Sequence, residues 1–394
     1  MPENAGQSPA PLTLSPVVAL VLTVMAFAAV PFLLSPLLPD LADSFGLTAA
    51  QAGLAVSVFG GTLAVTAPLV GLCGGRLRRP LLIRAGLLLF LLGLVGAALA
   101  PGHGLLLAAL AVAGLAGGMF LPTAYAVVGD HVPYQARGRV MGQVMAGWAY
   151  AIVIVVPLGG LLAHLAGWRT AFLLLAGVTA AALLASGALP RNPAPASGPV
   201  PTLRSLSSAV FLNPGAVLGL WVNLCNMVAF FGAYTYLGIW LRDMLHLSSD
   251  GAGLMIVAYG VGLAVATLNG RFLDLLGHRR ALYLAHAGLA AGWVLLALVQ
   301  QPVTVAVLLG WIGLTQGTAL VGQSTLCSHQ SDVGRGAIMA LFTCTTYLGV
   351  FGGAALFGPI YSAQGYLTVV LLCGGLNLLA TFSLHIGRYW LRGH

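Results

Sequence analysis

The feature that most constrains this chain is a series of apolar runs, each about as long as a membrane-crossing helix. A helix rises about 1.5 Å per residue, so ~20 apolar residues span the hydrocarbon core of a bilayer. Of the 394 residues, 59% are hydrophobic and only 6% are charged, which is more apolar surface than a soluble domain can bury. The sequence therefore predicts an all-α integral membrane protein. Its twelve candidate transmembrane helices lie at 16–38, 49–74, 80–100, 104–129, 139–164, 168–189, 213–240, 249–273, 280–299, 303–325, 335–358 and 365–388.

A polar, proline-rich segment at 190–212 separates these runs into two sets of six. Proline and small polar residues in such density are typical of linkers. We therefore expect an N-terminal six-helix half at 1–189, a cytoplasmic linker at 190–212 and a C-terminal six-helix half at 213–394. Because residues 1–15 contain no Lys or Arg, we expect no cleavable signal peptide and a first helix that stays in place.

The distribution of arginine predicts the orientation. All sixteen basic residues are Arg, and with both termini inside, fourteen of them fall on cytoplasmic loops or ends. Only Arg169 and Arg242 then lie outside. The positive-inside rule thus favours a multi-pass protein of the cell (inner) membrane with both termini cytoplasmic. It also explains the net charge of +8 better than a nucleic-acid-binding patch does, because the arginines are scattered over short loops.

Two short loops occupy corresponding places in the two halves, where glycines allow tight turns and arginines favour the cytoplasmic side. The later loop resembles the loop Gly-x-x-x-Asp-Arg-x-Gly-Arg-Arg that each half of the major facilitator superfamily carries between its second and third helices. The matching positions here are Gly270, Asp274, Gly277, Arg279 and Arg280.

The earlier loop matches the same pattern less completely. It keeps Gly71, Arg76 and Arg79, but Gly75 stands where the family has its aspartate. The resemblance implies that Asp274 helps to hold the cytoplasmic side closed, so we expect a gating latch that rests mainly on the second half. The plainer interpretation of Asp274 is a solvated loop acid.

The resemblance implies a major-facilitator fold of two pseudo-symmetric six-helix halves that rock about a central site. Pro157, Gly159 and Gly160 in the fifth run resemble a helix-kink motif of antiporters in the family, although simple helix packing would select similar residues. The fourth run resembles the family's drug-efflux pattern around Gly114–Gly118. The arginine that this pattern carries four residues earlier is Leu110 here.

Candidates for proton coupling are few, because no Asp, Glu or Arg lies near the middle of any run. Ionisable groups inside the membrane are the usual proton carriers. This leaves Asp40 and Asp130 at the ends of the first and fourth runs, and His286 in the ninth. Asp130 is alternatively a partner of Arg137 or Arg139. His286 is alternatively a hydrogen-bonded packing residue, which we favour.

A neutral substrate cavity follows from the same absence of charge. Polar and aromatic side chains recur at three- and four-residue steps within several runs, so they share helix faces that avoid lipid. Such faces include helix–helix contacts as well as cavity walls. The expected cavity residues are Thr123, Tyr125, Gln143, Tyr150, Asn223, Asn226, Phe230, Tyr234, Gln316, Gln323, Thr343 and Tyr347.

These features together predict a secondary active transporter that exports a small organic solute, a drug or metabolite, by proton-coupled antiport. The alternatives are uptake or facilitated diffusion of a small neutral solute, or a membrane receptor or scaffold. We expect no enzyme activity, cofactor or metal, because the sequence lacks a phosphate-binding loop, paired carboxylates and any Cys-x-x-Cys pair. The expected partners are a small-molecule substrate, protons and the lipid bilayer, with the chain acting as a monomer.

Overall fold

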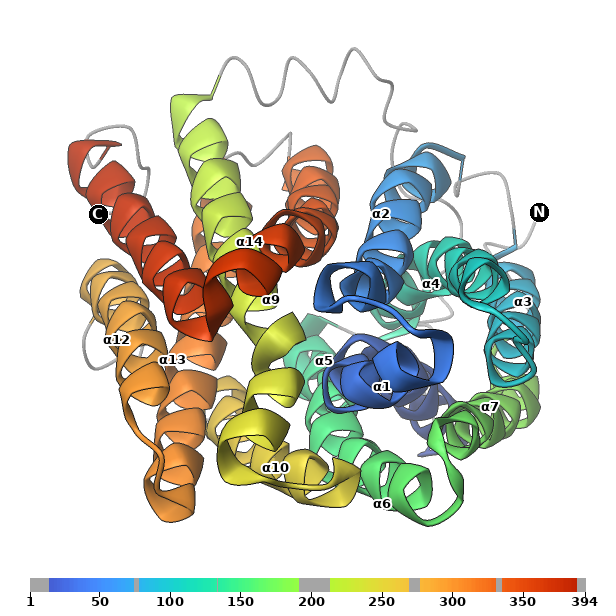
Figure 1. Cartoon of the computed structure of the whole chain (residues 1–394). Coiled ribbons are helices and arrows are strands. Elements are labelled where there is room, and N and C mark those ends of the chain that lie inside the picture. The colour runs from blue at the N-terminus through green and yellow to red at the C-terminus, as the bar shows by residue number, and fades with distance from the viewer. Residues whose placement is uncertain are drawn as a thin grey trace, which may run out of the picture.

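The computed structural model describes residues 14–73, 78–132, 134–190, 213–268, 277–330 and 335–387, and these residues are almost entirely helical, with no strand among them (Figure 1). The helices of the first half are α1 Leu14–Phe45, α2 Ala49–Cys73, α3 Arg79–Ala98, α4 His103–His131, α5 Tyr134–Tyr150, η2 Ala151–Val155, α6 Val156–Ala166, α7 Trp168–Ala185 and η3 Ser186–Ala188. Those of the second half are α9 Pro214–Leu245, α10 Ser249–Leu268, α12 His278–Leu298, α13 Pro302–His329 and α14 Arg335–Ile386. The predicted all-α class is confirmed.

Eleven helices in the described residues are long and apolar enough to cross a membrane. The last of them, α14, has 52 residues, and Gly365 breaks it with a φ of 75° and a ψ of −178°. At about 1.5 Å per residue a continuous helix of that length would exceed twice the ~30 Å hydrocarbon core. Dividing α14 at Gly365 gives the predicted number of twelve, and Gly365 is the first residue of the run expected at 365–388.

The two halves lie side by side and meet mainly along three pairs of helices. In Figure 1 the first half occupies the right side around α1, α3 and α7, and the second half occupies the left side around α12 and α13. Across the boundary α1 packs against α9, α2 against α14, and α6 against α10. Residues 191–212 lie outside the described residues, so the bounds of the linker and of the two halves stay predictions.

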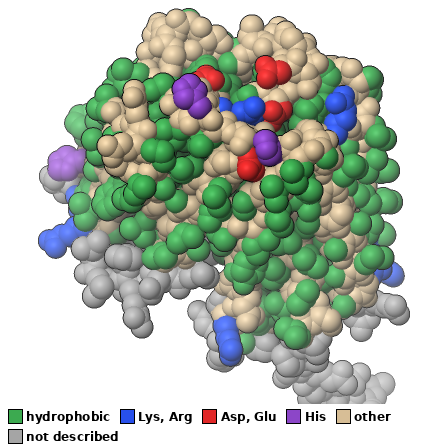
Figure 2. All heavy atoms as spheres, turned by 60° about the horizontal axis from the view of Figure 1, so that its bottom comes forward, with side chains coloured by type: hydrophobic (Ala, Val, Ile, Leu, Met, Phe, Trp, Pro, Cys, Tyr) green, Lys and Arg blue, Asp and Glu red, His purple; other side chains and the backbone are tan. Residues whose placement is uncertain are grey.

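The two ends of the helix bundle differ in their charged residues. We call them the Asp40 end, where α1, α6 and α9 end, and the linker end, which carries residues 190 and 213. Four of the five described acids, Asp40, Asp43, Asp243 and Asp250, lie at the Asp40 end, whereas Asp130 lies at the linker end. Figure 2 shows acidic side chains gathered at one end, with arginines and histidines beside them, while hydrophobic side chains cover much of the flank. Such an apolar flank suits contact with lipid tails.

Candidate functional site

A cluster of aromatic side chains joins the two halves in the interior of the bundle. We call it the aromatic centre. Its members come from both halves, with most rings 5% exposed or less and Tyr125 and Trp148 partly buried. They are Phe27 and Phe32 on α1, Tyr125 on α4, Trp148 on α5, Phe230, Phe231 and Tyr234 on α9, Tyr259 on α10, Trp293 on α12 and Tyr347 on α14.

Phe32 makes most of the contacts across the boundary. Its ring centroid lies 5.1 Å from that of Tyr234, 5.9 Å from that of Tyr259 and 6.3 Å from that of Phe230. Aromatic pairs at 4.5–7 Å contribute about 0.5–1.5 kcal/mol each beyond the burial of their area. One phenylalanine therefore holds α1 against two helices of the second half.

The aromatic centre is uncharged. None of the ring contacts in it involves an Asp, Glu, Arg or Lys among the described residues. The Trp293 indole Nε1 is buried there and has no hydrogen-bond partner in the described part of the chain. A buried donor without an acceptor is costly, so this N–H is available to an acceptor group on a bound molecule. The arrangement suits a neutral or amphipathic organic molecule with a ring and a carbonyl or hydroxyl group.

Beside the aromatic centre, the Ser35 hydroxyl of α1 forms hydrogen bonds with two backbone groups of α9. It donates to the Tyr234 carbonyl at 2.6 Å and accepts from the Gly238 amide at 3.0 Å. An uninterrupted helix joins those two backbone groups directly. A Cβ on residue 238 would stand 2.0 Å from the Ser35 carbonyl oxygen, so glycine is required for this approach.

Prolines in α1 explain why this helix can form hydrogen bonds with α9. The helix contains Pro31, Pro36 and Pro39. Each proline lacks an N–H and leaves the carbonyl four residues earlier without its helical partner. Pro36 frees the Phe32 carbonyl, which accepts a hydrogen bond from the Tyr234 hydroxyl at 3.1 Å. The same segment of α1 thus bonds to α9 through both a side chain and a backbone carbonyl, and we call this pair of contacts the α1–α9 joint.

A second buried cluster, the amide–imidazole network, lies within the second half. It consists of Asn226 on α9, His286 on α12, Gln316 and Gln323 on α13, and Asn377 on α14, all 1% exposed or less. His286 Nδ1 lies 3.2 Å from Asn377 Oδ1, and its Nε2 lies 3.1 Å from Gln323 Nε2. Asn226 and Gln316 exchange hydrogen bonds at 3.1 and 3.4 Å.

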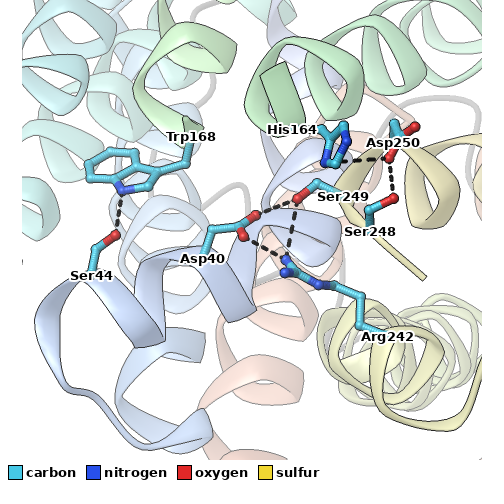
Figure 3. A network of polar contacts seen from close by, with 8 residues as sticks. All are labelled: Asp40, Ser44, His164, Trp168, Arg242, Ser248, Ser249 and Asp250. Carbon is cyan, nitrogen blue, oxygen red and sulfur yellow. Dashed lines mark hydrogen bonds and ion pairs between the residues drawn. The ribbon is translucent and has the colours of Figure 1, made fainter. Parts of the chain in front are cut away.

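An ion pair ties the halves together at the Asp40 end (Figure 3). The Asp40 carboxylate on α1 lies 2.8 Å from Arg242 Nη1 on α9 and accepts a 2.7 Å hydrogen bond from the Ser249 hydroxyl on α10. Arg242 also donates to Ser249 at 3.3 Å. We call this triad the Asp40 latch. Nearby, Ser248 donates to Asp250, whose carboxylate lies 3.9 Å from His164 Nδ1 on α6.

The fifth membrane segment consists of α5, η2 and α6, and its residues at the kink motif contact both halves. The π-helical turn Ala151–Val155 ends two residues before Pro157, and such turns are a known cause of helix kinks. A Cβ at Gly159 would meet the Leu33 side chain on α1 at 2.6 Å. A Cβ at Gly160 would meet the Ser249 carbonyl oxygen on α10 at 2.6 Å. The two glycines therefore permit close packing next to the Asp40 latch.

The structure distributes the predicted cavity residues over several places. Tyr125, Phe230, Tyr234 and Tyr347 belong to the aromatic centre, whereas Asn226, Gln316 and Gln323 belong to the amide–imidazole network. Asn223 donates to the Phe342 carbonyl and to the Thr345 and Thr346 hydroxyls on α14. The hydroxyls of Thr123 and Thr343 donate to carbonyls of their own helices. Gln143 and Tyr150 are exposed, and among the described residues the side chain of neither makes a hydrogen bond or a ring contact.

The predicted gating loops are only partly described. Arg76, Gly270 and Asp274 lie outside the described residues. Gly71 lies in the last turn of α2, and Gly277, with a φ of 73°, immediately precedes α12. Arg279 donates to the Tyr283 hydroxyl at 3.2 Å, while Arg280 is exposed.

The expectation that Asp130 pairs with Arg137 or Arg139 is wrong. Its carboxylate lies 2.6 Å from Arg79 Nη1, which brings a residue of the predicted gating loop against the end of α4. Arg137 instead donates to the Val132 carbonyl at 3.4 Å. Arg79 at the start of α3 and Asp130 near the end of α4 meet because these neighbouring helices run in opposite directions and both reach the linker end.

Several residues that now define the site were missed from the sequence. They are Phe27, Phe32, Ser35, Trp148, Arg242, Ser249, Tyr259, Trp293 and Asn377. The prolines of the first run were the available signal for Ser35, because proline frees carbonyls that another helix can bond. The aromatic residues gave no such signal, since a ring in an apolar run faces lipid as readily as it faces the interior.

Comparison with known proteins gives a consistent result. The family profile "Major Facilitator Superfamily" matches residues 19–353. An uncharacterized MFS-type transporter, YwfA of Bacillus subtilis (strain 168), is 34% identical over 384 residues, which cover 94% of this chain and 92% of that protein. A chloramphenicol resistance protein of Streptomyces lividans is 31% identical over 382 residues, or 91% of this chain and 94% of that protein.

A more distant relative and one solved structure extend the comparison. A probable sugar efflux transporter of Pasteurella multocida (strain Pm70) is 25% identical over 383 residues, covering 96% of this chain and 93% of that protein. The crystal structure of the nucleoside transporter NupG superposes with a TM-score of 0.74 at 16% identity, and the match covers 94% of this chain and 99% of that one. At this identity the likeness concerns the fold.

Proposed function

This chain belongs to the Major Facilitator Superfamily, and from that premise we propose that it exports a small neutral or amphipathic organic solute by alternating access. It is a multi-pass membrane protein, and its family and structural neighbours are transporters. In alternating access, the two halves rock about a site between them and expose it to one side of the membrane at a time.

The observation that carries the proposal is the aromatic centre, because it lies where the two halves meet. Phe32 and Phe27 of the first half contact Tyr234 and Tyr347 of the second at centroid distances of 5.1 and 5.9 Å. A solute that binds among these rings would touch both halves and would therefore sense their relative position. The absence of charged side chains among these contacts favours neutral solutes.

The contacts at the Asp40 end support a state that is closed on that side. The Asp40 latch and the close approach of Gly160 to Ser249 lie there, and the α1–α9 joint lies between them and the aromatic centre. We take the linker end as cytoplasmic from the arginine distribution, so this state would receive its solute from the cytoplasm. Export is further supported by the sugar efflux relative, and a drug-like solute by the chloramphenicol resistance relative.

We propose proton antiport as the driving mechanism. Facilitated diffusion remains the second candidate, because the described residues place no carboxylate in the aromatic centre. The two mechanisms differ in one measurable respect. Antiport accumulates solute against its gradient when the pH gradient is imposed, whereas facilitated diffusion only equalises concentrations.

Everted membrane vesicles test the proposal. Labelled chloramphenicol or members of a panel of neutral sugars and nucleosides are added outside vesicles with and without the chain, and uptake is followed with and without an acidic interior. Export in the cell corresponds to uptake into these vesicles. We expect at least one neutral compound to accumulate only when the interior is acidic, and Phe32→Ala to reduce this accumulation by about tenfold, the equivalent of about 1.4 kcal/mol.

Phe382→Ala serves as the matched control, because this ring is 60% exposed on the flank and outside the aromatic centre. It is expected to leave uptake unchanged. If no panel compound moves, the proposed export of a neutral solute is wrong; if Phe32→Ala and Phe382→Ala behave alike, the aromatic centre is not the solute site.

A further inference from the structure

The hydrogen bonds of His286 in the amide–imidazole network indicate which of its ring nitrogens carries a hydrogen. Asn377 Nδ2 donates to the Cys373 carbonyl at 3.0 Å, which directs the Asn377 Oδ1 toward His286. His286 Nδ1 must therefore carry the hydrogen of that 3.2 Å contact. Its Nε2 then accepts from the Gln323 Nε2 group at 3.1 Å. The imidazole is consequently neutral in this state, with both nitrogens satisfied.

The network also contains an unused acceptor next to the imidazole. Gln323 Oε1 is buried and has no hydrogen-bond partner among the described residues. Rotation of the Gln323 amide by half a turn would place Oε1 where Nε2 now stands. A hydrogen added to His286 Nε2 would then meet an acceptor, while Nδ1 would keep its bond to Asn377. One amide rotation is therefore enough to satisfy the protonated ring.

No charged side chain among the described residues forms an ion pair or hydrogen bond with this imidazole. The elements packed around it are α9, α13 and α14. The titratable thiol and phenol groups on these elements are those of Cys225, Tyr234 and Tyr236 on α9, Cys327 on α13, and Cys344, Tyr347, Tyr361, Tyr366 and Cys373 on α14. The charged or basic groups on these elements and on α12 stand near the two ends, and they are Arg242, Asp243, Arg279, Arg280, His329 and His385.

Two helices, α9 and α12, connect the amide–imidazole network to the aromatic centre. Asn226 and Phe230 are four residues apart on α9, and His286 and Trp293 are seven apart on α12, so each pair shares a helix face. The two aromatic members touch, with centroids 6.1 Å apart. A change at the imidazole can therefore reach the proposed solute site through one or two helical turns.

We propose that His286 is the proton-binding site of this transporter and that Gln323 is the amide that turns to accommodate the proton. The proposal rests on the function proposed above. A proton from water on the Asp40 side joins Nε2 when that side is open. It leaves toward the linker end when the Asp40 end closes, because a buried imidazolium with only neutral amides around it is costly. Solute then binds the closed state, in which the imidazole is neutral, which gives exchange of one proton for one solute molecule.

A titration without any solute provides the first test, with the proton itself as the probe. Trp293 lies two turns from His286 on the same face, so its fluorescence should respond to the charge of the ring. For the purified chain we expect a step in emission as the pH is lowered, because protonation of His286 adds a charge near the indole. The step should be lost in His286→Gln and in Trp293→Phe. It should persist in His131→Gln, whose histidine lies at the end of α4 and bonds the Val127 carbonyl.

Gln323 variants keep the test decisive if His286→Gln does not fold. Gln323→Glu puts a carboxylate against Nε2 and should move the emission step to higher pH, because an opposite charge favours the protonated ring. Gln323→Met removes both the donor and the acceptor and should weaken the step or move it to lower pH. A network that only packs helices would give the same titration in both variants and in wild type.

Everted vesicles with labelled chloramphenicol provide the second test. His286→Gln should lose at least tenfold of the accumulation driven by an acidic interior, yet keep exchange of labelled for unlabelled compound without a gradient. Undiminished gradient-driven accumulation in this variant would overturn the proposal, as would a wild-type emission that is flat across the pH range. If wild type moves no compound but retains a step that depends on His286, the transport function fails and the proton site stands.

Discussion

Replacement of Asp40 by Asn is the sharpest perturbation of the closed state, because it removes the charge that joins three helices. Asp40 Oδ1 and Arg242 Nη1 are 2.8 Å apart, and the two side chains are 23% and 21% exposed. Ion pairs at a fully exposed site contribute about 0–1 kcal/mol, whereas hydrogen bonds to charged groups in less exposed sites contribute about 1.5–3 kcal/mol. For this partly buried pair, with Ser249 as an additional donor, we expect about 1–2 kcal/mol.

The loss acts on an equilibrium between two states of the bundle. Because the pair bridges the halves, it stabilises the state in which the Asp40 end is closed and contributes little when that end is open. A change of 1–2 kcal/mol multiplies the open-to-closed ratio by about 5 to 30. The Asn side chain keeps the volume and can still accept from Ser249, so the folded bundle should persist.

Spin-label distances measure this ratio directly. One label is placed at Ala166, at the end of α6, and one at Met244, at the end of α9, in a chain whose five native cysteines are replaced. Both residues are exposed and belong to opposite halves. The longer-distance population should grow by the stated factor in Asp40→Asn and in Arg242→Gln, and the double variant should show little more than either single one.

A double-mutant cycle separates the pair from its surroundings. The expected coupling energy between the two positions is about 1–2 kcal/mol, and it should diminish in high salt, because screening weakens a partly exposed pair. A coupling energy below about 0.3 kcal/mol, within the range found for residues that do not interact, would refute the view that this pair holds the end closed.

Three further changes test neighbouring features. Ser35→Ala removes the hydroxyl of the α1–α9 joint but lets α9 restore its own ladder, so the same spin labels should show the open population rising by about 2- to 12-fold, equivalent to 0.5–1.5 kcal/mol. Gly160→Val introduces a Cβ that would lie 2.6 Å from the Ser249 carbonyl, so α6 and α10 must separate; longer label distances and reduced vesicle uptake are expected. Asp130→Asn breaks a pair with Arg79 inside one half, so unfolding in detergent should show a loss of about 1 kcal/mol while the label distances stay unchanged.

The fold could be predicted from the sequence because a bilayer sets the minimum length of every helix that crosses it. The expected runs and the observed helices differ mostly by turns at their ends, as for 16–38 against Leu14–Phe45. The divided last element shows why the agreement holds. The last two runs were expected at 335–358 and 365–388, and the positive φ of Gly365 breaks α14 at the start of the second one.

The sequence predicted residues of the site only where several polar residues share one helix face. The sequence grouped Asn226, Gln316 and Gln323 as interior residues, and the structure brings them together with His286. It could not distinguish a face that binds solute from one that bonds other amides, because both need polar side chains that avoid lipid. Asn377 was missed because it is the only amide in its run, which gives no periodic pattern to recognise.

Contacts between the halves could not be foreseen in the same way. Phe32 and Tyr234 are both interior candidates on apolar helices, but nothing local in either run indicates that their rings meet. From the sequence, Asp40 was recognised as a charged residue at a helix end, and we predicted only a role in proton coupling for it. Its partner Arg242 lies about two hundred residues further along the chain, so the pair follows from packing of the halves and from no local pattern.

The prolines of α1 have a consequence for how the protein is made. The Phe32 carbonyl and the Ser35 hydroxyl find their partners on α9, and Ser35 and Tyr234 are separated by 199 positions in the chain. At the usual elongation rate of about 5–20 residues per second, α1 leaves the ribosome some 10–40 s before α9 does. During that interval the Phe32 carbonyl, which Pro36 frees, lacks its partner on α9 in a lipid environment, where an unpaired carbonyl costs several kcal/mol. We therefore expect α1 to reach its final membrane position only after α9 has been inserted. A chain stopped at the linker would keep an unpaired Phe32 carbonyl in α1, which membrane quality control could recognise.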